Sequence, residues 1–275
     1  MGKCTTDTEA LRELLETEYA FGQRARNSVR EAFLEYLAED SLVLEPTPTP
    51  GHAFYTAAAA QDNSGKLEWY PALADMAGSN DLAFTTGPWI YMPAAGGGPQ
   101  IHGHFLTIWK RDAACRWRVQ LDGGISHAAP TGAESPLTLH QASYTKRAEP
   151  PPNLVAENAV THAINDFQGA ARQDGFAAGL RTYARTGDFA FYTDGKSPMG
   201  LAAANHYLTG HPVLVPGEWR EDARGRSADF TLAYSVGVLF ESNRRSGHAY
   251  VQIWQYGSKV ANWGLRILLI GAPAP

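Results

Sequence analysis

The chain has 275 residues and a formal net charge of −5, with 44% hydrophobic and 19% charged residues. This composition excludes a wholly disordered chain, and the lack of a dense basic stretch argues against a nucleic-acid-binding surface. No apolar run approaches the roughly 20 residues that a membrane-spanning helix requires. We therefore expect a folded protein with no nucleic acid and no membrane as partners.

The first forty residues show helical spacing. Thr6-x-x-Glu9 and Ser28-x-x-Glu31 are capping-box patterns that predict the starts of two helices. Beyond Asp40 the spacing changes to that of strands, separated by glycine and proline. The elements expected there are a strand at 41–45, a short helix at 54–61 and strands at 67–70, 82–92, 101–111 and 116–126.

The second half of the chain predicts the same order of elements. Helices are expected at 154–172 and 176–184, a strand at 188–192, a short helix at 201–208, and strands at 213–219, 231–241, 247–256 and 262–270. Helices followed by antiparallel strands indicate the α+β class, with helices on one face of a curved sheet.

The two halves also match in sequence. Residues 33–44 match 180–191, residues 79–87 match 229–237, and residues 105–109 and 117–119 match 250–254 and 263–265. These matches keep their order at offsets of about 145 to 150 residues, which indicates a tandem duplication. We predict two domains, copy one at 1–127 and copy two at 153–275. A proline-rich linker at 128–152 is expected to separate them.

The last predicted strand differs in polarity between the copies. In copy one, Trp117, Val119 and Leu121 alternate with polar residues, which is typical of a half-solvated strand. In copy two, the end of the strand at 262–270 is apolar on both faces. We expect the other copy to cover part of this second face. The predicted assembly is a monomer with an internal pseudo-dimer of the two copies.

Residues 39–46, 79–89 and 103–111 resemble the nuclear transport factor 2-like superfamily, and within it a SnoaL-like domain family without an assigned function. The resemblance covers copy one almost fully and copy two more weakly. It implies two tandem cone-shaped domains, each a curved antiparallel sheet closed by about three helices. The superfamily includes ketosteroid isomerase, polyketide cyclases, scytalone dehydratase and limonene epoxide hydrolase, as well as members that only bind or assemble, so the fold does not settle the function.

Comparison with ketosteroid isomerase implies three catalytic candidates. Glu45 precedes Pro46 at the place of the general base, Tyr19 matches the oxyanion tyrosine, and His104 lies near the position of the third polar residue. A carboxylate in a dry pocket can remove a proton next to a carbonyl, while a phenol and an imidazole stabilise the oxygen anion. Copy two has Tyr192 where copy one has Glu45, so it is not expected to catalyse the same reaction.

Each candidate also has a structural interpretation. Glu45 can be a solvated carboxylate at a strand end, and Tyr19 can be a core tyrosine at helical spacing. Asp122, before two glycines, can be an acid at the mouth of the cone, but an Asp-Gly pair is also a turn signal.

Metal and cofactor sites are not expected. His102-x-His104 has a spacing suited to a metal, yet no third ligand follows at a telling distance, so His104 is interpreted as a hydrogen-bonding residue in a pocket. The two cysteines, Cys4 and Cys115, are too few for a disulfide framework.

Four aromatic residues of copy one are candidates for lining the pocket or for its packed core: Trp69, Tyr70, Trp89 and Tyr91. The favoured hypothesis is a small-molecule-binding protein whose copy-one cone holds a hydrophobic carbonyl compound. The first alternative is an isomerase, cyclase or dehydratase that uses Glu45, Tyr19 and His104. The second is a non-catalytic assembly module. The expected location is the cytoplasm, or the periplasm or cell exterior if an export signal has been removed.

Overall fold

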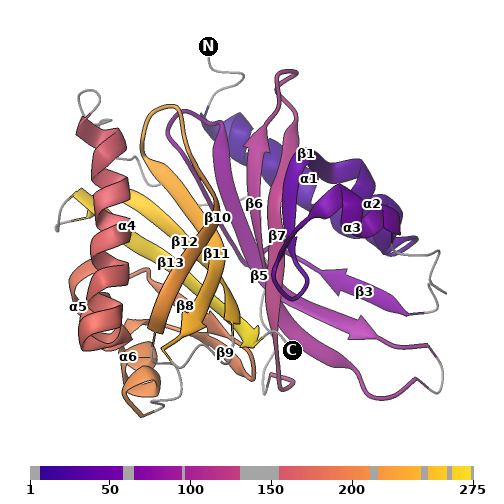
Figure 1. Cartoon of the computed structure of the whole chain (residues 1–275). Coiled ribbons are helices and arrows are strands. Elements are labelled where there is room, and N and C mark those ends of the chain that lie inside the picture. Colours follow the sequence, from indigo (N-terminus) through magenta and orange to yellow (C-terminus); the bar gives the residue numbers. More distant parts are fainter. Residues whose placement is uncertain are drawn as a thin grey trace. The chain divides into compact units, whose positions relative to one another are not determined.

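The computed structural model describes residues 7–57, 65–94, 97–130, 155–210, 216–242, 247–258 and 262–273. The chain forms two compact units (Figure 1). The described part of unit 1 lies within 7–45 and 49–130, and that of unit 2 within 46–48 and 155–273. Most of the predicted linker at 128–152 falls outside the described residues, so the proposed domain boundaries stay predictions.

The described residues of unit 1 form three helices and a seven-stranded sheet. In chain order its elements are α1 (Asp7–Ala25), α2 (Val29–Tyr36), β1 (Leu37–Leu44), β2 (Pro48–Pro50), α3 (Gly51–Ala57), β3 (Lys66–Trp69), β4 (Leu73–Met76), β5 (Leu82–Met92), β6 (Ile101–Arg111) and β7 (Trp117–His127). The strand order is β2-β1-β7-β6-β5-β3, and β4 also pairs with β5. The expected α+β class is confirmed. The sheet is mixed rather than purely antiparallel, because β1 runs parallel to β7.

Local sequence explains how unit 1 closes over one sheet face. Ser28 caps α2 by accepting a hydrogen bond from the backbone N–H of Glu31, as the capping-box pattern predicts. The buried stripe of α1, which includes Leu14 and Phe21, packs with side chains of the long strands such as Trp109. We call the sheet face that carries Trp109 the helix face.

Unit 2 repeats this plan. Its elements are α4 (Val155–Asp174), α5 (Phe176–Tyr183), β8 (Ala190–Thr193), β9 (Lys196–Met199), α6 (Leu201–Gly210), β10 (Pro216–Arg226), β11 (Leu232–Glu241), β12 (Gly247–Ser258) and β13 (Asn262–Pro273). The strand order is β10-β11-β12-β13-β8-β9, and β8 pairs in parallel with β13 as β1 does with β7. The two units therefore share one topology, as a tandem repeat requires.

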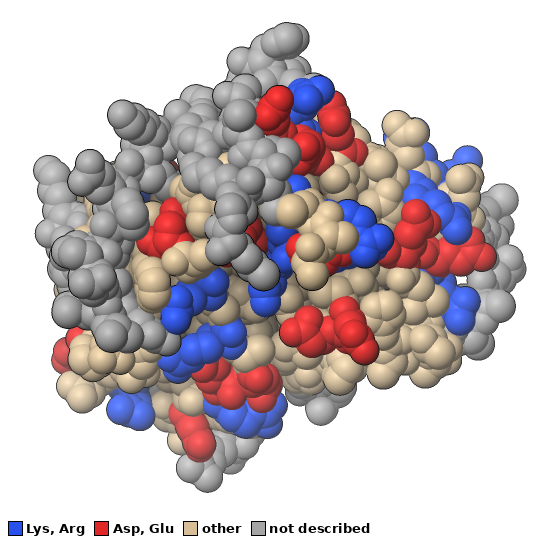
Figure 2. All heavy atoms as spheres, turned by 90° about the horizontal axis from the view of Figure 1, so that it is seen from above, with Lys and Arg blue, Asp and Glu red and all other residues tan. Residues whose placement is uncertain are grey.

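Charges of both signs are interspersed over the described surface seen in Figure 2, without a large field of one sign. Edge strand β10 illustrates the pattern, because Arg220 pairs with Asp222 and Arg224 pairs with Glu221. Charged side chains on an edge strand discourage pairing with other strands. Among the described helices, none combines the length and apolarity needed to cross a membrane.

Candidate acid–base site

A row of polar side chains crosses the helix face of unit 1. Thr85 of β5 pairs directly with Thr107 of β6, and Thr107 pairs directly with Asp122 of β7. Directly paired residues of antiparallel strands project from the same sheet face. Their neighbours Ala83, Trp109 and Val119 belong to the core beneath the helices, so the row Thr85–Thr107–Asp122 faces the helices too.

Glu18 enters this region from α1 and is fully buried. The indole N–H of Trp69 donates to its Oε1 over 2.6 Å, the hydroxyl of Thr85 donates to Oε2 over 2.5 Å, and the indole N–H of Trp109 donates to Oε2 over 3.1 Å. Burial raises the pKa of Glu18, and these three hydrogen bonds oppose the rise. Because Glu18 has no exposed surface, a ligand arriving from solvent cannot contact it directly.

Asp122 is more accessible than Glu18, since its side chain is only half-buried. The Thr107 hydroxyl donates to its Oδ2 over 2.6 Å. Burial raises the pKa of Asp122 to about 8; the Thr107 hydrogen bond opposes this rise, and the charges of Glu18 and Glu45 add to it. Asp122 is thus a carboxyl group that can donate a proton near neutral pH.

Glu45 and Tyr55 complete the group. Glu45 follows β1 and is exposed, although the surrounding protein raises its pKa through partial desolvation. Tyr55 lies on α3 and stacks on Phe33 with ring centroids 4.3 Å apart. Burial raises the pKa of Tyr55, and the charges of Asp122 and Glu45 raise it further. Tyr55 therefore lies within reach of the charges of both carboxyl groups, and Asp122 within reach of the charge of Glu45. We call Glu45, Tyr55 and Asp122 the acid site.

Tyr19, the phenol expected beside Glu45, lies next to Glu18 on α1 and packs against the core. Burial and then the charge of Glu18 raise its pKa. The charges of Glu45 and Asp122 act on Tyr55, not on Tyr19. Tyr55 is thus the phenol that the structure brings to Glu45, and it comes from the short helix that the sequence predicted only in outline.

The structure also separates His104 from Glu45, which corrects the predicted grouping. His104 alternates with Phe105 and Thr107 along β6, so it projects from the sheet face opposite the helices. There its Nδ1 lies 2.7 Å from Nε2 of His127, whose Nδ1 donates to the carbonyl oxygen of Ala128 over 2.7 Å. Since that carbonyl can only accept, His127 Nε2 accepts the proton of His104 Nδ1.

The four predicted pocket aromatics have different surroundings. Trp69 and Trp89 are directly paired across β3 and β5 on the helix face, and the ring of Trp89 covers Gly103. Tyr91 is 37% exposed, towards the end of β5. Tyr70 is half-buried beyond β3, where its carbonyl lies so close to Gly87 that a Cβ there would approach it to 2.0 Å. Trp69 is thus the aromatic that a hydrogen bond ties to the polar row, through Glu18.

Among the described residues, no group of three or more His, Cys, Asp or Glu side chains is arranged to hold a metal ion.

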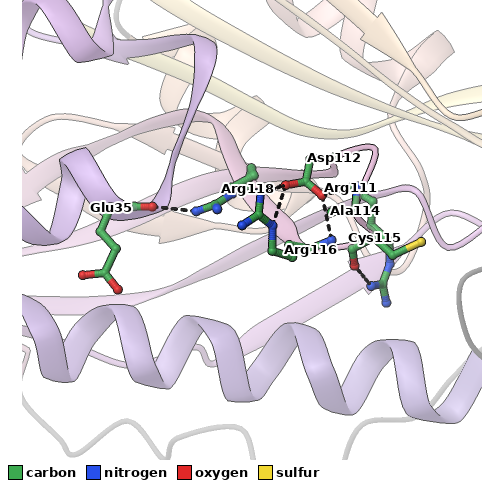
Figure 3. A network of polar contacts seen from close by, with 7 residues as sticks. All are labelled: Glu35, Arg111, Asp112, Ala114, Cys115, Arg116 and Arg118. Atoms are coloured by element: carbon green, nitrogen blue, oxygen red, sulfur yellow. Dashed lines mark hydrogen bonds and ion pairs between the residues drawn. The ribbon is translucent and has the colours of Figure 1, made fainter.

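A separate cleft of about 410 Å³ lies in unit 1 beside α1 and the β6–β7 turn. Its three arginines are paired within the protein, and Figure 3 shows Arg111 with Cys115, Arg116 with Asp112, and Arg118 with Glu35. Arg116 bonds Asp112 over 2.8 Å, Arg118 donates to the carbonyl oxygen of Glu35 over 2.6 Å, and Arg111 also bonds Glu13 over 2.6 Å. These contacts stabilise the turn and compensate the positive charge.

Unit 2 lacks the acid site. Strand register makes Leu268 the counterpart of Asp122 and Thr193 the counterpart of Glu45. The sequence alignment had placed Tyr192 opposite Glu45, and the register shifts this match by one residue. A shift of one residue exchanges the two sheet faces. Unit 2 still has no carboxyl group at either position.

Sequence reasoning missed Glu18 and Tyr55 and left Asp122 undecided. Glu18 did carry a signal, because it lies seven residues after Leu11 and three before Phe21, on the apolar stripe of α1. A charged side chain on a buried helix face requires hydrogen-bond partners, because burying an unpaired charge is energetically costly. Tyr55 carried no comparable signal.

No protein-family model matches the sequence, and no curated protein matches it either. Solved structures do. A nuclear transport factor 2-like superfamily protein from Salmonella enterica is 13% identical with a TM-score of 0.37, and the match covers 46% of this chain and 96% of that one. A protein of this fold from Shewanella oneidensis, of unknown function, is 16% identical with a TM-score of 0.33, over 43% and 98% of the two chains.

An LEH-like epoxide hydrolase from M. tuberculosis is 13% identical with a TM-score of 0.32, and the match covers 41% of this chain and 77% of that one. Each of these three matches covers between 41% and 46% of this chain. At such identities the likeness concerns the fold and leaves the chemistry of the site open.

Proposed function

We propose that unit 1 binds a small, uncharged carbonyl compound at the acid site and transfers a proton on it. The observation that carries this proposal is the convergence of Glu45, Tyr55 and Asp122 on the helix face of unit 1, where the charge of Glu45 raises the pKa values of Asp122 and Tyr55. Carboxyl groups whose pKa values are pushed apart are typical of acid–base pairs. The charge of Glu45 raises the pKa of Asp122, so Glu45 ionises first and is the base.

The proposed reaction follows from these roles. The protonated Asp122 and the neutral phenol of Tyr55 donate hydrogen bonds to the carbonyl oxygen of the ligand. The Glu45 carboxylate removes a proton from the carbon next to the carbonyl, which leaves an enol or enolate. Return of that proton to another carbon isomerises the compound. Trp69, Trp89 and Phe105 lie on the same sheet face and offer apolar surface to the rest of the ligand.

Exchange of α-protons tests this proposal without knowledge of the natural substrate. 2-Tetralone, 1-indanone and cyclohexenone are incubated with the protein in D₂O, and loss of the α-proton signals is followed by NMR. The wild-type protein is expected to accelerate exchange of at least one ketone. Glu45→Gln is expected to slow this exchange by about 100-fold or more, since general bases contribute on that scale.

Glu39→Gln is the matched control, because Glu39 is an exposed carboxylate on the same strand, β1. It should leave exchange unchanged, and so should His104→Gln, whose side chain projects from the other sheet face. If the ketones bind but exchange is not accelerated, unit 1 binds carbonyl compounds without transferring a proton, and the proposed reaction is refuted. A fully active Glu45→Gln variant would refute the assigned base.

A further inference from the structure

Glu18 has an environment unusual for a charged residue. Its carboxyl group has no exposed surface, yet two indole N–H groups and one hydroxyl converge on it. Indoles can only donate, and the Thr85 hydroxyl, which donates to Glu18, also accepts from Trp109 over 2.8 Å. These donors, of which Trp109 shares its single N–H between Thr85 and Glu18, favour the ionised carboxyl and oppose the rise in the pKa of Glu18 that burial causes.

The paired threonines connect this buried carboxyl to the acid site. Thr85 binds Glu18 and is the direct cross-strand partner of Thr107, which binds Asp122. Neighbouring strands lie about 4.8 Å apart, so the backbones of Thr85 and Asp122, which are two strands apart in this row, are separated by about 10 Å. Buried charges at such a distance still influence each other, because little water screens them.

Unit 2 shows what the fold does without this carboxyl. Phe167 of α4 contacts Tyr183, Trp219 and Trp254, as Phe21 of α1 contacts Tyr36, Trp69 and Trp109. These equivalent contacts define the register between the two helices. Three residues earlier, the position of Glu18 is occupied in unit 2 by the buried Ile164.

Unit 2 has a tryptophan at the position of Trp69 but no carboxyl group at the position of Glu18 to accept its hydrogen bond. Trp219, the counterpart of Trp69, has a buried indole N–H with no hydrogen-bond partner among the described residues. The counterparts of Glu18 and Asp122 in unit 2 are thus Ile164 and Leu268, and the topology is unchanged. Ser235, the counterpart of Thr85, donates instead to Glu221 of edge strand β10 over 2.7 Å. Unit 2 therefore forms this fold without a carboxyl group at either the Glu18 or the Asp122 position.

We propose that Glu18 is a positioning residue that acts through its buried negative charge, keeps Asp122 in its acid form and so sets the pH range of the acid site. This inference rests on the proposed function of Asp122 as proton donor. Consistent with it, the charge of Glu18 raises the pKa of Asp122. Among the described residues, the other charge that raises the pKa of Asp122 is that of Glu45, which belongs to the site itself.

The test is an NMR titration of the full-length protein without ligand. The protein is labelled with ¹³C at the aspartate carboxyl groups, and the Asp122 signal is identified by its loss in Asp122→Asn. In wild-type protein Asp122 should titrate near 8. In Glu18→Gln its pKa should fall by about one unit, the size of a charge interaction over this distance. Glu16→Gln is the control, because Glu16 is an exposed carboxylate on the same helix and should leave the titration unchanged.

A second measurement protects the test against a Glu18→Gln variant that does not fold. The indole N–H signals of Trp69 and Trp109 report the ionisation of Glu18 in the wild-type protein, because both indoles donate to it. Glu18 must lose its proton at a lower pH than Asp122. A Glu18 that stays protonated until Asp122 has ionised would overturn the inference, as would an unshifted Asp122 in folded Glu18→Gln.

This titration is independent of the ketone assay. If the protein does not accelerate α-proton exchange but the titration gives the expected shift, the proposed function is refuted while the coupling between Glu18 and Asp122 still holds. If the protein accelerates exchange but the pKa of Asp122 is unchanged in Glu18→Gln, only the proposed role of Glu18 is refuted.

Discussion

The hydroxyl of Thr107 donates a hydrogen bond to Oδ2 of Asp122 over 2.6 Å, from the residue directly opposite on the neighbouring strand. This bond favours the ionised carboxyl, against the burial that favours the protonated one. The protonation of Asp122 is therefore a balance that single substitutions can shift in either direction.

Removal of the Thr107 hydroxyl should raise the pKa of Asp122. Thr107→Val keeps the shape of the side chain and deletes the donor, so the ionised form loses a hydrogen bond worth about 1.5–3 kcal/mol, or roughly one to two pKa units. The ¹³C titration described above measures this change. Thr86→Val is the comparison, because Thr86 lies beside Thr85 but donates to the carbonyl oxygen of Phe105. A Thr107→Val protein with an unchanged or lower Asp122 pKa would contradict the assigned donor.

The raised pKa of Asp122 also predicts how stability depends on pH. The folded protein holds this proton up to about pH 8, whereas the unfolded chain releases it near its ordinary pKa of 3.8. The stabilising contribution of Asp122 is therefore complete below about pH 4 and is lost as pH rises towards 8. Between these limits the free energy of unfolding should fall by at most about 1.4 kcal/mol per pH unit from this group.

Asp122→Asn should remove that slope. Denaturant unfolding of both proteins at pH 5, 6, 7 and 8 gives the comparison, and the variant should gain stability relative to wild type as the pH rises. Parallel curves for the two proteins would show that Asp122 titrates normally.

The equivalent tryptophans of the two units should respond differently to the same substitution. Trp69→Phe deletes a donor to Glu18 and leaves a buried oxygen with one bond fewer, at a cost of about 1–3 kcal/mol beyond the loss of ring volume. Trp219→Phe deletes an indole N–H that has no partner among the described residues, so only the volume term applies. Denaturant unfolding of both variants isolates the hydrogen bond, and equal losses of stability would argue against it.

The oligomeric state is expected to be monomeric. We expect the two copies to meet within one chain the need for pairing that a single-copy domain would meet with a second chain, so that a second copy of this chain is not required. Size-exclusion chromatography with light scattering should give about the chain mass of 29.8 kDa. A value near twice that mass would contradict the prediction.

The sequence by itself determines the architecture of this protein. Ordered matches between 79–87 and 229–237, and between 105–109 and 250–254, reveal the repeat, and the changes of spacing locate most helices and strands. Periodicity is a local property of the chain, so it survives without knowledge of the fold.

Only the tertiary structure decided which side chains share the site. If side chains alternated strictly along β7, Asp122 would project from the polar face of the strand and Val119 from the other face. The register shifts by one residue at Gln120, so that Val119 pairs with Trp109 and Leu121 pairs with Ile108. This bulge turns Asp122 towards the helices, because one inserted residue exchanges the faces of everything beyond it.

The partners of Asp122 also come from distant parts of the chain. Glu18 arrives from α1 and Tyr55 from α3, and neither position follows from the spacing of β7. His104 has a residue type suited to the chemistry, but its place in the alternation of β6 turns it to the other face. Residue type and spacing therefore predict what the chain can contain, whereas pairing register and helix packing decide which groups meet.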